Sequence, residues 1–414
     1  METLLILTHL TIVLLFGIIF TLISRRLKIP HILMLLLAGI FLGSLSYGDE
    51  PLIYFPAIFV DSVGILALVL VVFDGASRFK WKEFDSLTLL ASKMTLTFLM
   101  LNIVFLTIFT TIIFNIENVF LALIFAALMS GTSADAVLSM FKEKGNKITN
   151  LLEVESLINT PITVLLPFII IGIVQKIGIG GFEYSEFIQQ FLGIIQQFVI
   201  GIGAGVMMGL IVFKIMKKYY SHRLSPVLLI TSTLLTYILA ENLSGNGVLA
   251  VTILGLFFGN LYVKKKQLLF EFSSTFGNSL MILVFVLVGI RIPLPLNDFT
   301  FIASSLILFL FYVAIRSMSI YVSTIKENIT IKEKIFLTLN MPKGIAVAVI
   351  VFSLGSYIFN TDGFLKNAAF SQLPDAQLIL NLALMFMIYS LILSTIVNHF
   401  SKFFLKVDIA KTSD

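Results

Sequence analysis

The sequence predicts an all-α, polytopic membrane protein with about 13 transmembrane helices. Of its 414 residues, 58% are hydrophobic and only 12% are charged, whereas a soluble domain carries roughly a quarter charged residues. Apolar stretches of about 20 residues, each able to cross a hydrocarbon core of roughly 30 Å as a helix, follow one another along the chain. We therefore exclude a soluble protein, and we do not interpret the net charge of +5 as a sign of nucleic-acid binding.

Thirteen apolar segments are separated by polar residues or by Gly and Pro. They span residues 4–24, 29–46, 56–76, 86–114, 117–141, 149–175, 187–215, 224–241, 246–263, 268–290, 300–325, 333–359 and 376–403. The first has no basic start or cleavage site and is interpreted as a retained span rather than a signal peptide. We expect one transmembrane domain over residues 1–405 and a short cytoplasmic tail over 406–414.

Basic residues are concentrated in alternate connections between these spans. The segments that follow odd-numbered spans hold 22 of the 28 Lys and Arg residues, whereas those after even-numbered spans hold Lys176, Arg291 and Lys366 beside several acidic residues. Because short basic segments are retained in the cytoplasm, we expect the N-terminus outside and the C-terminus inside. The same reasoning predicts a multi-pass protein of the cell (plasma or inner) membrane.

The residue types that the sequence lacks exclude several kinds of site. There is no Cys, and the four His residues have no metal-ligand spacing, so no disulfide, thiolate or zinc site is expected. No nucleophile–base arrangement is present. We predict neither an enzyme nor a cofactor or metal site, and no nucleic-acid partner.

Two spans contain residues that do not suit lipid. Lys343, between Pro342 and Gly344, lies about ten residues into its span, or roughly 15 Å at 1.5 Å per residue. The span 117–141 contains the small polar run Ser130-Gly131-Thr132-Ser133-Ala134-Asp135. Backbone groups freed by a helix break are tolerated in a membrane only where they line a site or cavity. We therefore expect both helices to unwind and to meet near the middle of the bilayer.

The beginning of the span 149–175 provides polar partners at similar depth. Glu155 and Asn159 are four residues apart and share one helix face. We expect Glu155 to form a buried ion pair with Lys343 that fixes the register of two helices. Arg316, deep in the span 300–325, requires a carboxylate or a cluster of carbonyls, and we interpret it as a structural anchor between helices.

Asp135 is the carboxylate beside the first predicted break. A carboxylate in a low-dielectric site can exchange a proton near neutral pH. A monovalent cation can replace that proton among hydroxyl, carbonyl and water oxygens. Asp135 is therefore a candidate for the group that binds ion and proton in turn.

These segments resemble the monovalent cation–proton antiporter superfamily, and its sodium/proton exchanger branch in particular. Gly131-Thr132-Ser133 is similar to the family's unwound-helix motif. The segment 155–160 is similar to its Glu-Ser-x-x-(Asn/Ser/Asp)-Asp element, and Pro342-Lys343-Gly344 to its Pro-(Arg/Lys)-Gly element, whose cation pairs with that Glu. The resemblance implies a sodium/proton exchanger-like fold with inverted five-helix repeats, a homodimer, and elevator-like or rocking alternating access.

The resemblance also implies an ion- and proton-binding set, with one departure from the family pattern. The set comprises Thr132, Ser133, Asp135, Glu155, Asn159 and Thr160. The family's ion-binding Asp falls on Thr160, whose hydroxyl can coordinate a cation but cannot carry a proton at physiological pH. We expect the role of this missing Asp in ion and proton binding to fall to Asp135, or to Glu155 released from Lys343.

The sequence thus predicts a secondary active transporter that exchanges Na⁺ or K⁺ for H⁺ across the lipid bilayer. One alternative is an exchanger-fold protein without proton coupling, which acts as a passive channel, a sensor or a structural membrane partner. Another is a transporter of a small anionic solute, in which an unpaired Lys343 faces the substrate.

Overall fold

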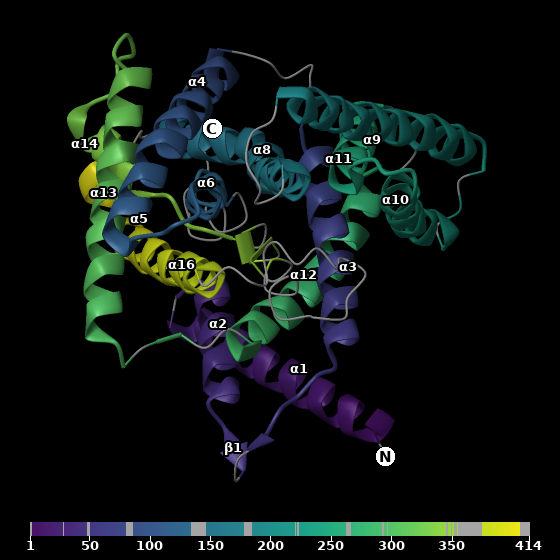
Figure 1. Cartoon of the computed structure of the whole chain (residues 1–414), viewed down its shortest axis with the longest axis horizontal. Coiled ribbons are helices and arrows are strands. Elements are labelled where there is room, and N and C mark those ends of the chain that lie inside the picture. The colour runs from purple at the N-terminus through teal and green to yellow at the C-terminus, as the bar shows by residue number, and fades with distance from the viewer. Residues whose placement is uncertain are drawn as a thin grey trace, which may run out of the picture.

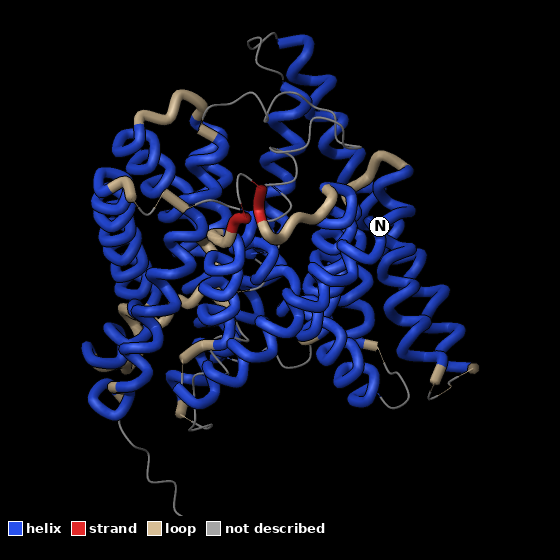
Figure 2. Tube along the Cα trace, turned by 90° about the horizontal axis from the view of Figure 1, so that it is seen from below, coloured by secondary structure: helices blue, strands red, loops and turns tan. Residues whose placement is uncertain are grey.

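The chain folds into a bundle of helices (Figures 1 and 2). The structure is a computed structural model that describes residues 2–27, 29–47, 50–79, 86–133, 146–177, 184–219, 221, 223–261, 266–291, 294–295, 297–344, 347–348, 350–351, 354 and 375–405. Figure 2 shows helix along almost all of the described chain, with one small strand pair. The predicted tail, residues 406–414, lies outside the described residues.

The first half of the chain contains a pair of two-residue strands and a series of mostly long helices. In chain order these are α1 (Glu2–Leu27), α2 (His31–Gly43), β1 (Ser46–Tyr47), β2 (Glu50–Pro51), α3 (Ala57–Ser77), α4 (Ser86–Leu101), the π-helix η2 (Asn102–Leu106), α5 (Thr107–Phe114), α6 (Val119–Leu128) and α8 (Lys147–Ile177). The strands β1 and β2 pair antiparallel, with Ser46 opposite Pro51.

In the second half, all the regular elements in the described part of the chain are helices. It contains α9 (Tyr184–Lys218), α10 (Leu224–Asn242), α11 (Gly247–Asn260), α12 (Lys266–Arg291), α13 (Phe299–Ser323), α14 (Ile331–Leu339), α16 (Ala376–His399) and α17 (Ser401–Phe404). Asn246, Asp298 and Thr330 cap the N-termini of α11, α13 and α14 by accepting hydrogen bonds from backbone N–H groups, as short polar side chains do at such positions.

Each of the thirteen predicted spans overlaps a helix, so the predicted all-helical membrane fold is confirmed. Seven of the described helices are long and apolar enough to cross a membrane, and α2, α6, α11 and part of α12 are shorter apolar helices. The span predicted over 86–114 is not one regular α-helix, because the five residues of η2 adopt π-helical geometry between α4 and α5.

The helices form two packed groups (Figure 1). In one group α1, α2, α3, α9, α10, α11 and α12 lie against one another, and in the other α4, η2, α5, α6, α8, α13, α14 and α16 do so. Buried residues of both groups, among them Phe73 and Met208 in the first and Phe125 and Phe386 in the second, belong to a single hydrophobic cluster.

Helices α2 and α12 approach each other closely through two glycines. A Cβ atom at Gly289 would lie 2.7 Å from both Ile40 N and Leu36 O, and one at Gly39 would collide with the carbonyl of Val286. Small residues let helix backbones approach in a membrane, where van der Waals packing holds helices together. The contact therefore requires glycine at both positions.

We predict that Gly289→Ala destabilises the protein by about 1–3 kcal/mol, the cost of overpacking a close contact. Gly277, on the same helix, is the matched control because a Cβ there meets no atom within 4 Å. Denaturant titration of the detergent-solubilised variants measures the difference. If Gly289→Ala is as stable as Gly277→Ala, α2 and α12 do not cross at this contact.

Candidate functional site

Helix α6 ends at the small polar run, as the sequence predicts. Its last helical residue is Leu128, and Gly131, Thr132 and Ser133 have no helical structure. Ser130 N donates to the carbonyl of Ala127, three residues back, in place of the α-helical bond to Ala126. The carbonyl of Ala126 thereby loses its helical donor, and those of Met129, Ser130 and Gly131 lie beyond the last helical residue.

The second predicted break is confirmed in α14. This helix begins with a capping box between Thr330 and Glu333 and ends at Leu339, and residues 340–344 are not helical. Pro342 cannot donate a backbone hydrogen bond and disfavours helical geometry in the residue before it. The break places Lys343 in the protein interior, where its side chain is fully buried.

The two unwound segments contact each other directly. Ser133 N donates a hydrogen bond of 2.9 Å to the carbonyl of Pro342. Gly344 lies so close to Ser133 that a Cβ at this position would collide with Cβ and Oγ of the serine. Glycine is therefore required at 344 by the approach of the other chain segment, and the breaks meet as the sequence predicts.

Lys343 binds the end of α6. Its Nζ donates to the carbonyl of Met129 at 2.7 Å and also to that of Gly131, and it lies 5.0 Å from the centre of the Tyr312 ring. The Tyr312 hydroxyl donates to the same Met129 carbonyl at 3.0 Å. Because the C-terminus of a helix carries partial negative charge, an ammonium group is stabilised there.

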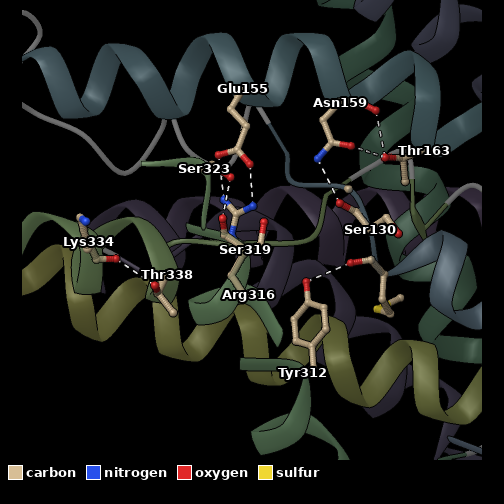
Figure 3. A network of polar contacts seen from close by, with 12 residues as sticks. Ser130, Glu155, Asn159, Thr163, Tyr312, Arg316, Ser319, Ser323, Lys334 and Thr338 are labelled. Atoms are coloured by element: carbon tan, nitrogen blue, oxygen red, sulfur yellow. Dashed lines mark hydrogen bonds and ion pairs between the residues drawn. The ribbon is translucent and has the colours of Figure 1, made fainter. Parts of the chain in front are cut away.

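Asn159 binds the carbonyl of Ser130, which lies in the chain between the Met129 and Gly131 carbonyls that Lys343 binds. Its Nδ2 donates to Ser130 O at 3.1 Å, and its Oδ1 accepts from the Thr163 hydroxyl at 2.8 Å. Figure 3 shows Asn159 and Glu155 projecting from the same side of α8, which confirms the predicted shared face. Asn159 therefore joins α8 to the unwound end of α6.

The predicted ion pair between Glu155 and Lys343 is wrong. Glu155 Oε1 and Oε2 instead accept hydrogen bonds of 2.6 and 2.7 Å from the two terminal nitrogens of Arg316, and both side chains are fully buried. Figure 3 shows this pair between α8 and α13. The planar guanidinium group matches a carboxylate with two parallel bonds, whereas the ammonium group of Lys343 needs only single acceptors, which carbonyls supply.

Arg316 has the predicted geometry of an anchor between helices, with a carboxylate as its partner. Its guanidinium carbon also lies 4.7 Å from the centre of the Phe98 ring of α4. One residue thus links α13 with α8 and α4, which holds three helices together beside the breaks.

The other predicted ligands differ in how far the structure describes them. Thr132 is 6% exposed, and its Oγ1 has no hydrogen-bond partner among the described residues. Ser133 lies at the contact between the breaks. Asp135 lies outside the described residues, and of Thr160 only the backbone, within α8, is described. The roles of all these residues in ion or proton binding stay predictions.

Sequence reasoning missed two residues of this site, Asn102 and Tyr312. Asn102 is fully buried, and its Nδ2 donates to the Ala126 carbonyl at 2.7 Å and to Ser130 Oγ at 3.2 Å. A lone amide within a long apolar span was an available signal for Asn102. Tyr312 had no comparable signal, because a tyrosine in a membrane helix is unremarkable without its partners.

A helical membrane bundle in which two interrupted helices meet at their breaks, beside buried ionisable groups, belongs to the class of secondary transporters with discontinuous helices. The comparison with protein families agrees with this class. The chain belongs to the family described as "Sodium/hydrogen exchanger, transmembrane", whose model matches residues 10–400.

Several relatives are named as antiporters. The chain is 25% identical over 387 residues to the K(+)/H(+) antiporter NhaP of Alkalimonas amylolytica, covering 91% of this chain and 63% of the relative. It is 27% identical over 285 residues to the low-affinity Na(+)/H(+) antiporter NhaS1 of Synechocystis, covering 64% and 50%. It is 23% identical to the probable Na(+)/H(+) antiporter 2 of Methanocaldococcus jannaschii, covering 91% of both chains.

The fold is also similar to a solved structure. The sodium proton antiporter MjNhaP1 of Methanocaldococcus jannaschii at pH 8 aligns with a TM-score of 0.76 and 21% sequence identity, covering 96% of this chain and 99% of the other. This likeness shows that the two chains share a fold.

We predict that breaking the buried pair by Glu155→Gln or Arg316→Met destabilises the protein by about 3–5 kcal/mol, because each change leaves a buried charge or its donors without a partner. The double variant Glu155→Gln/Arg316→Met is expected to recover much of this loss. Unfolding free energies from denaturant titration give the coupling. Simple additivity of the two single changes would contradict a direct pair.

The ion pair of Asp74 and Arg78 is the matched control. These two side chains, four residues apart at the end of α3, remain 19% and 29% exposed. Solvent weakens such a pair to about 0–1 kcal/mol. Asp74→Asn is therefore expected to change stability much less than Glu155→Gln.

Proposed function

We propose that this protein is a secondary active transporter that exchanges a monovalent cation, Na⁺ or K⁺, for protons by alternating access. Membership of the sodium/hydrogen exchanger family supports the proposal, as do the relatives named as Na⁺/H⁺ and K⁺/H⁺ antiporters. The observation that carries it is the direct contact between two unwound segments, Ser133 with Pro342, inside a bundle of membrane helices. Unwound backbone in transporters provides carbonyl ligands for cations.

The chemistry of the contact region suits a monovalent cation. Na⁺ and K⁺ bind neutral oxygens of carbonyl and hydroxyl groups, which can replace their hydration shell. Thr132 offers a buried hydroxyl oxygen with no hydrogen-bond partner among the described residues. Ser133 adds a second hydroxyl at the contact. We propose that Thr132 and Ser133 contribute oxygen ligands, with Asn159 holding the segment in place through Ser130.

The arrangement of the charges bears on which group exchanges the proton. Both oxygens of Glu155 accept hydrogen bonds from Arg316. Glu155 is thus not paired with Lys343, and the proton exchange expected from its release by Lys343 does not apply. Asp135 stays the predicted exchanging carboxylate. If it has that role, Asp135→Asn abolishes proton movement in the exchange assay below while leaving Glu155 paired. Retention of exchange by Asp135→Asn would exclude it.

Transport of an anionic solute is disfavoured by the surroundings of Lys343. Its Nζ donates to two carbonyl oxygens and lies over the face of the Tyr312 ring. Carbonyl oxygens and aromatic faces carry partial negative charge, which repels an anion. The Lys343 ammonium group therefore binds the end of α6 and is not available to bind a solute anion.

We predict that the protein, reconstituted in liposomes containing a pH dye, moves protons when Na⁺ or K⁺ is added outside. Thr132→Val removes the unpartnered oxygen and is expected to raise the apparent KM for the cation about threefold to tenfold. Thr111→Val is the control and should leave the KM unchanged, because it removes another buried hydroxyl, near the end of α5, that has no hydrogen-bond partner among the described residues. No proton movement with any alkali cation at neutral or alkaline pH would refute antiport and leave a protein without proton coupling.

We further propose a cell-membrane location, an N-terminus outside, a cytoplasmic C-terminus and a homodimer. The alternation of basic connections supports the orientation, and the family resemblance supports the dimer. The mass of the detergent-solubilised protein, measured by light scattering, tests the dimer.

We predict opposite labelling of two introduced thiols in intact cells. The chain has no Cys, so Leu52→Cys and Tyr219→Cys each create a single thiol, at positions that are 47% and 67% exposed. A membrane-impermeant maleimide should label Leu52→Cys in intact cells and Tyr219→Cys only after permeabilisation. The reverse pattern would invert the proposed orientation.

A further inference from the structure

The π-helix η2 directs Asn102 toward the end of α6. Four buried residues recur at intervals of four along this span, namely Phe98, Asn102, Leu106 and Thr110. On a straight α-helix three such steps would rotate the last residue by about 120° away from the first. The wider π-turn takes up much of this drift, and both η2 and α5 pack against α6 and α13. Such π-turns occur frequently at functional sites.

The hydrogen bonds of Asn102 involve its amide nitrogen and not its amide oxygen. Its Nδ2 donates to Ala126 O and to Ser130 Oγ. A carbonyl can only accept, so this bond identifies the nitrogen of the amide and fixes the position of its oxygen. That oxygen, Oδ1, is fully buried and has no hydrogen-bond partner among the described residues.

A capping role alone does not account for an amide at this position. The hydroxyl of Ser130 already donates to Ala126 O at 2.8 Å, so the carbonyl is satisfied without Asn102. What Asn102 adds beside the Ala126 carbonyl is a further acceptor, its own amide oxygen, in the membrane interior. Two residues beyond Ser130, the buried Thr132 Oγ1 also has no partner among the described residues. A buried oxygen without a donor requires an explanation, and a bound ion or water is one.

We propose that Asn102 is a ligand of the transported cation, and that its Oδ1 coordinates Na⁺ or K⁺ at the end of α6. A dehydrated monovalent cation is bound by neutral amide and carbonyl oxygens, and neither unpartnered oxygen needs a proton donor when it faces a cation. This inference rests on the proposed function and adds η2 to the segments that form the site. No residue of α4, η2 or α5 is among the ligands expected from the sequence.

Two variants separate coordination from capping. Asn102→Leu removes both the amide oxygen and the donor, whereas Asn102→Ser keeps a group able to donate to Ala126 O but lacks the amide oxygen. Both are expected to raise the apparent KM for the cation about tenfold, which corresponds to the loss of one polar contact, and to change the preference among Li⁺, Na⁺ and K⁺. The maximal rate per folded protein should change little.

Asn381→Leu is the matched control, since Asn381 is another buried amide, in α16, whose Oδ1 accepts a bond from Gln377. It is expected to leave both KM and ion preference unchanged. A normal KM in Asn102→Ser would overturn the proposal, because capping alone would then suffice. An equal loss of maximal rate for all three ions, without a change in KM, would overturn it too.

A measurement on the unaltered protein covers the case in which the Asn102 variants do not fold. Crystals soaked in Rb⁺ should show anomalous density within coordination distance of Asn102 Oδ1. Rb⁺ bound elsewhere near the two unwound segments, or a water on Oδ1 in place of the ion, would overturn the proposal. This result does not depend on proton movement, so it is distinguishable from failure of the exchange assay, which bears on the proposed function instead.

Discussion

The carbonyl groups that α6 releases where it unwinds must find donors inside the protein, because the bilayer core has no water to supply them. Four segments provide these donors. Asn102 of η2 binds Ala126 O, Tyr312 of α13 and Lys343 of the second break bind Met129 O, and Asn159 of α8 binds Ser130 O. The unwound state of α6 is thus maintained by its neighbours, and each neighbouring helix is positioned in turn by the carbonyl that it binds.

The two buried cations beside the breaks have different partners for a chemical reason. Arg316 takes the carboxylate of Glu155 with two parallel bonds, which only a planar guanidinium group can form. Lys343 takes carbonyl oxygens at the end of α6. The described site therefore holds one internal ion pair and one ammonium group stabilised by backbone dipoles. A transported cation would enter a region in which neutral oxygens, rather than Glu155, are available.

The sequence predicts the membrane fold and both breaks because these depend on local properties. Apolar length defines the spans, and Pro342, Gly344 and the run at Ser130–Ser133 end helices wherever they stand. The partners of Glu155 and Lys343 depend on the rotation and spacing of helices distant in sequence, and depth along a span does not define these. The orientation of Asn102 depends on a π-helical turn, which inserts one extra residue into the helix. An apolar sequence gives no indication of such an insertion.

The polar contacts described at the site have a mechanical consequence. All of them join members of one helix group, namely η2, α6, α8, α13, α16 and the segment after α14. The boundary with the other group is crossed by a shared apolar cluster. Apolar surfaces can slide past one another in steps without breaking a directional bond. The group that carries the site could therefore shift as a rigid body while its internal bonds stay intact.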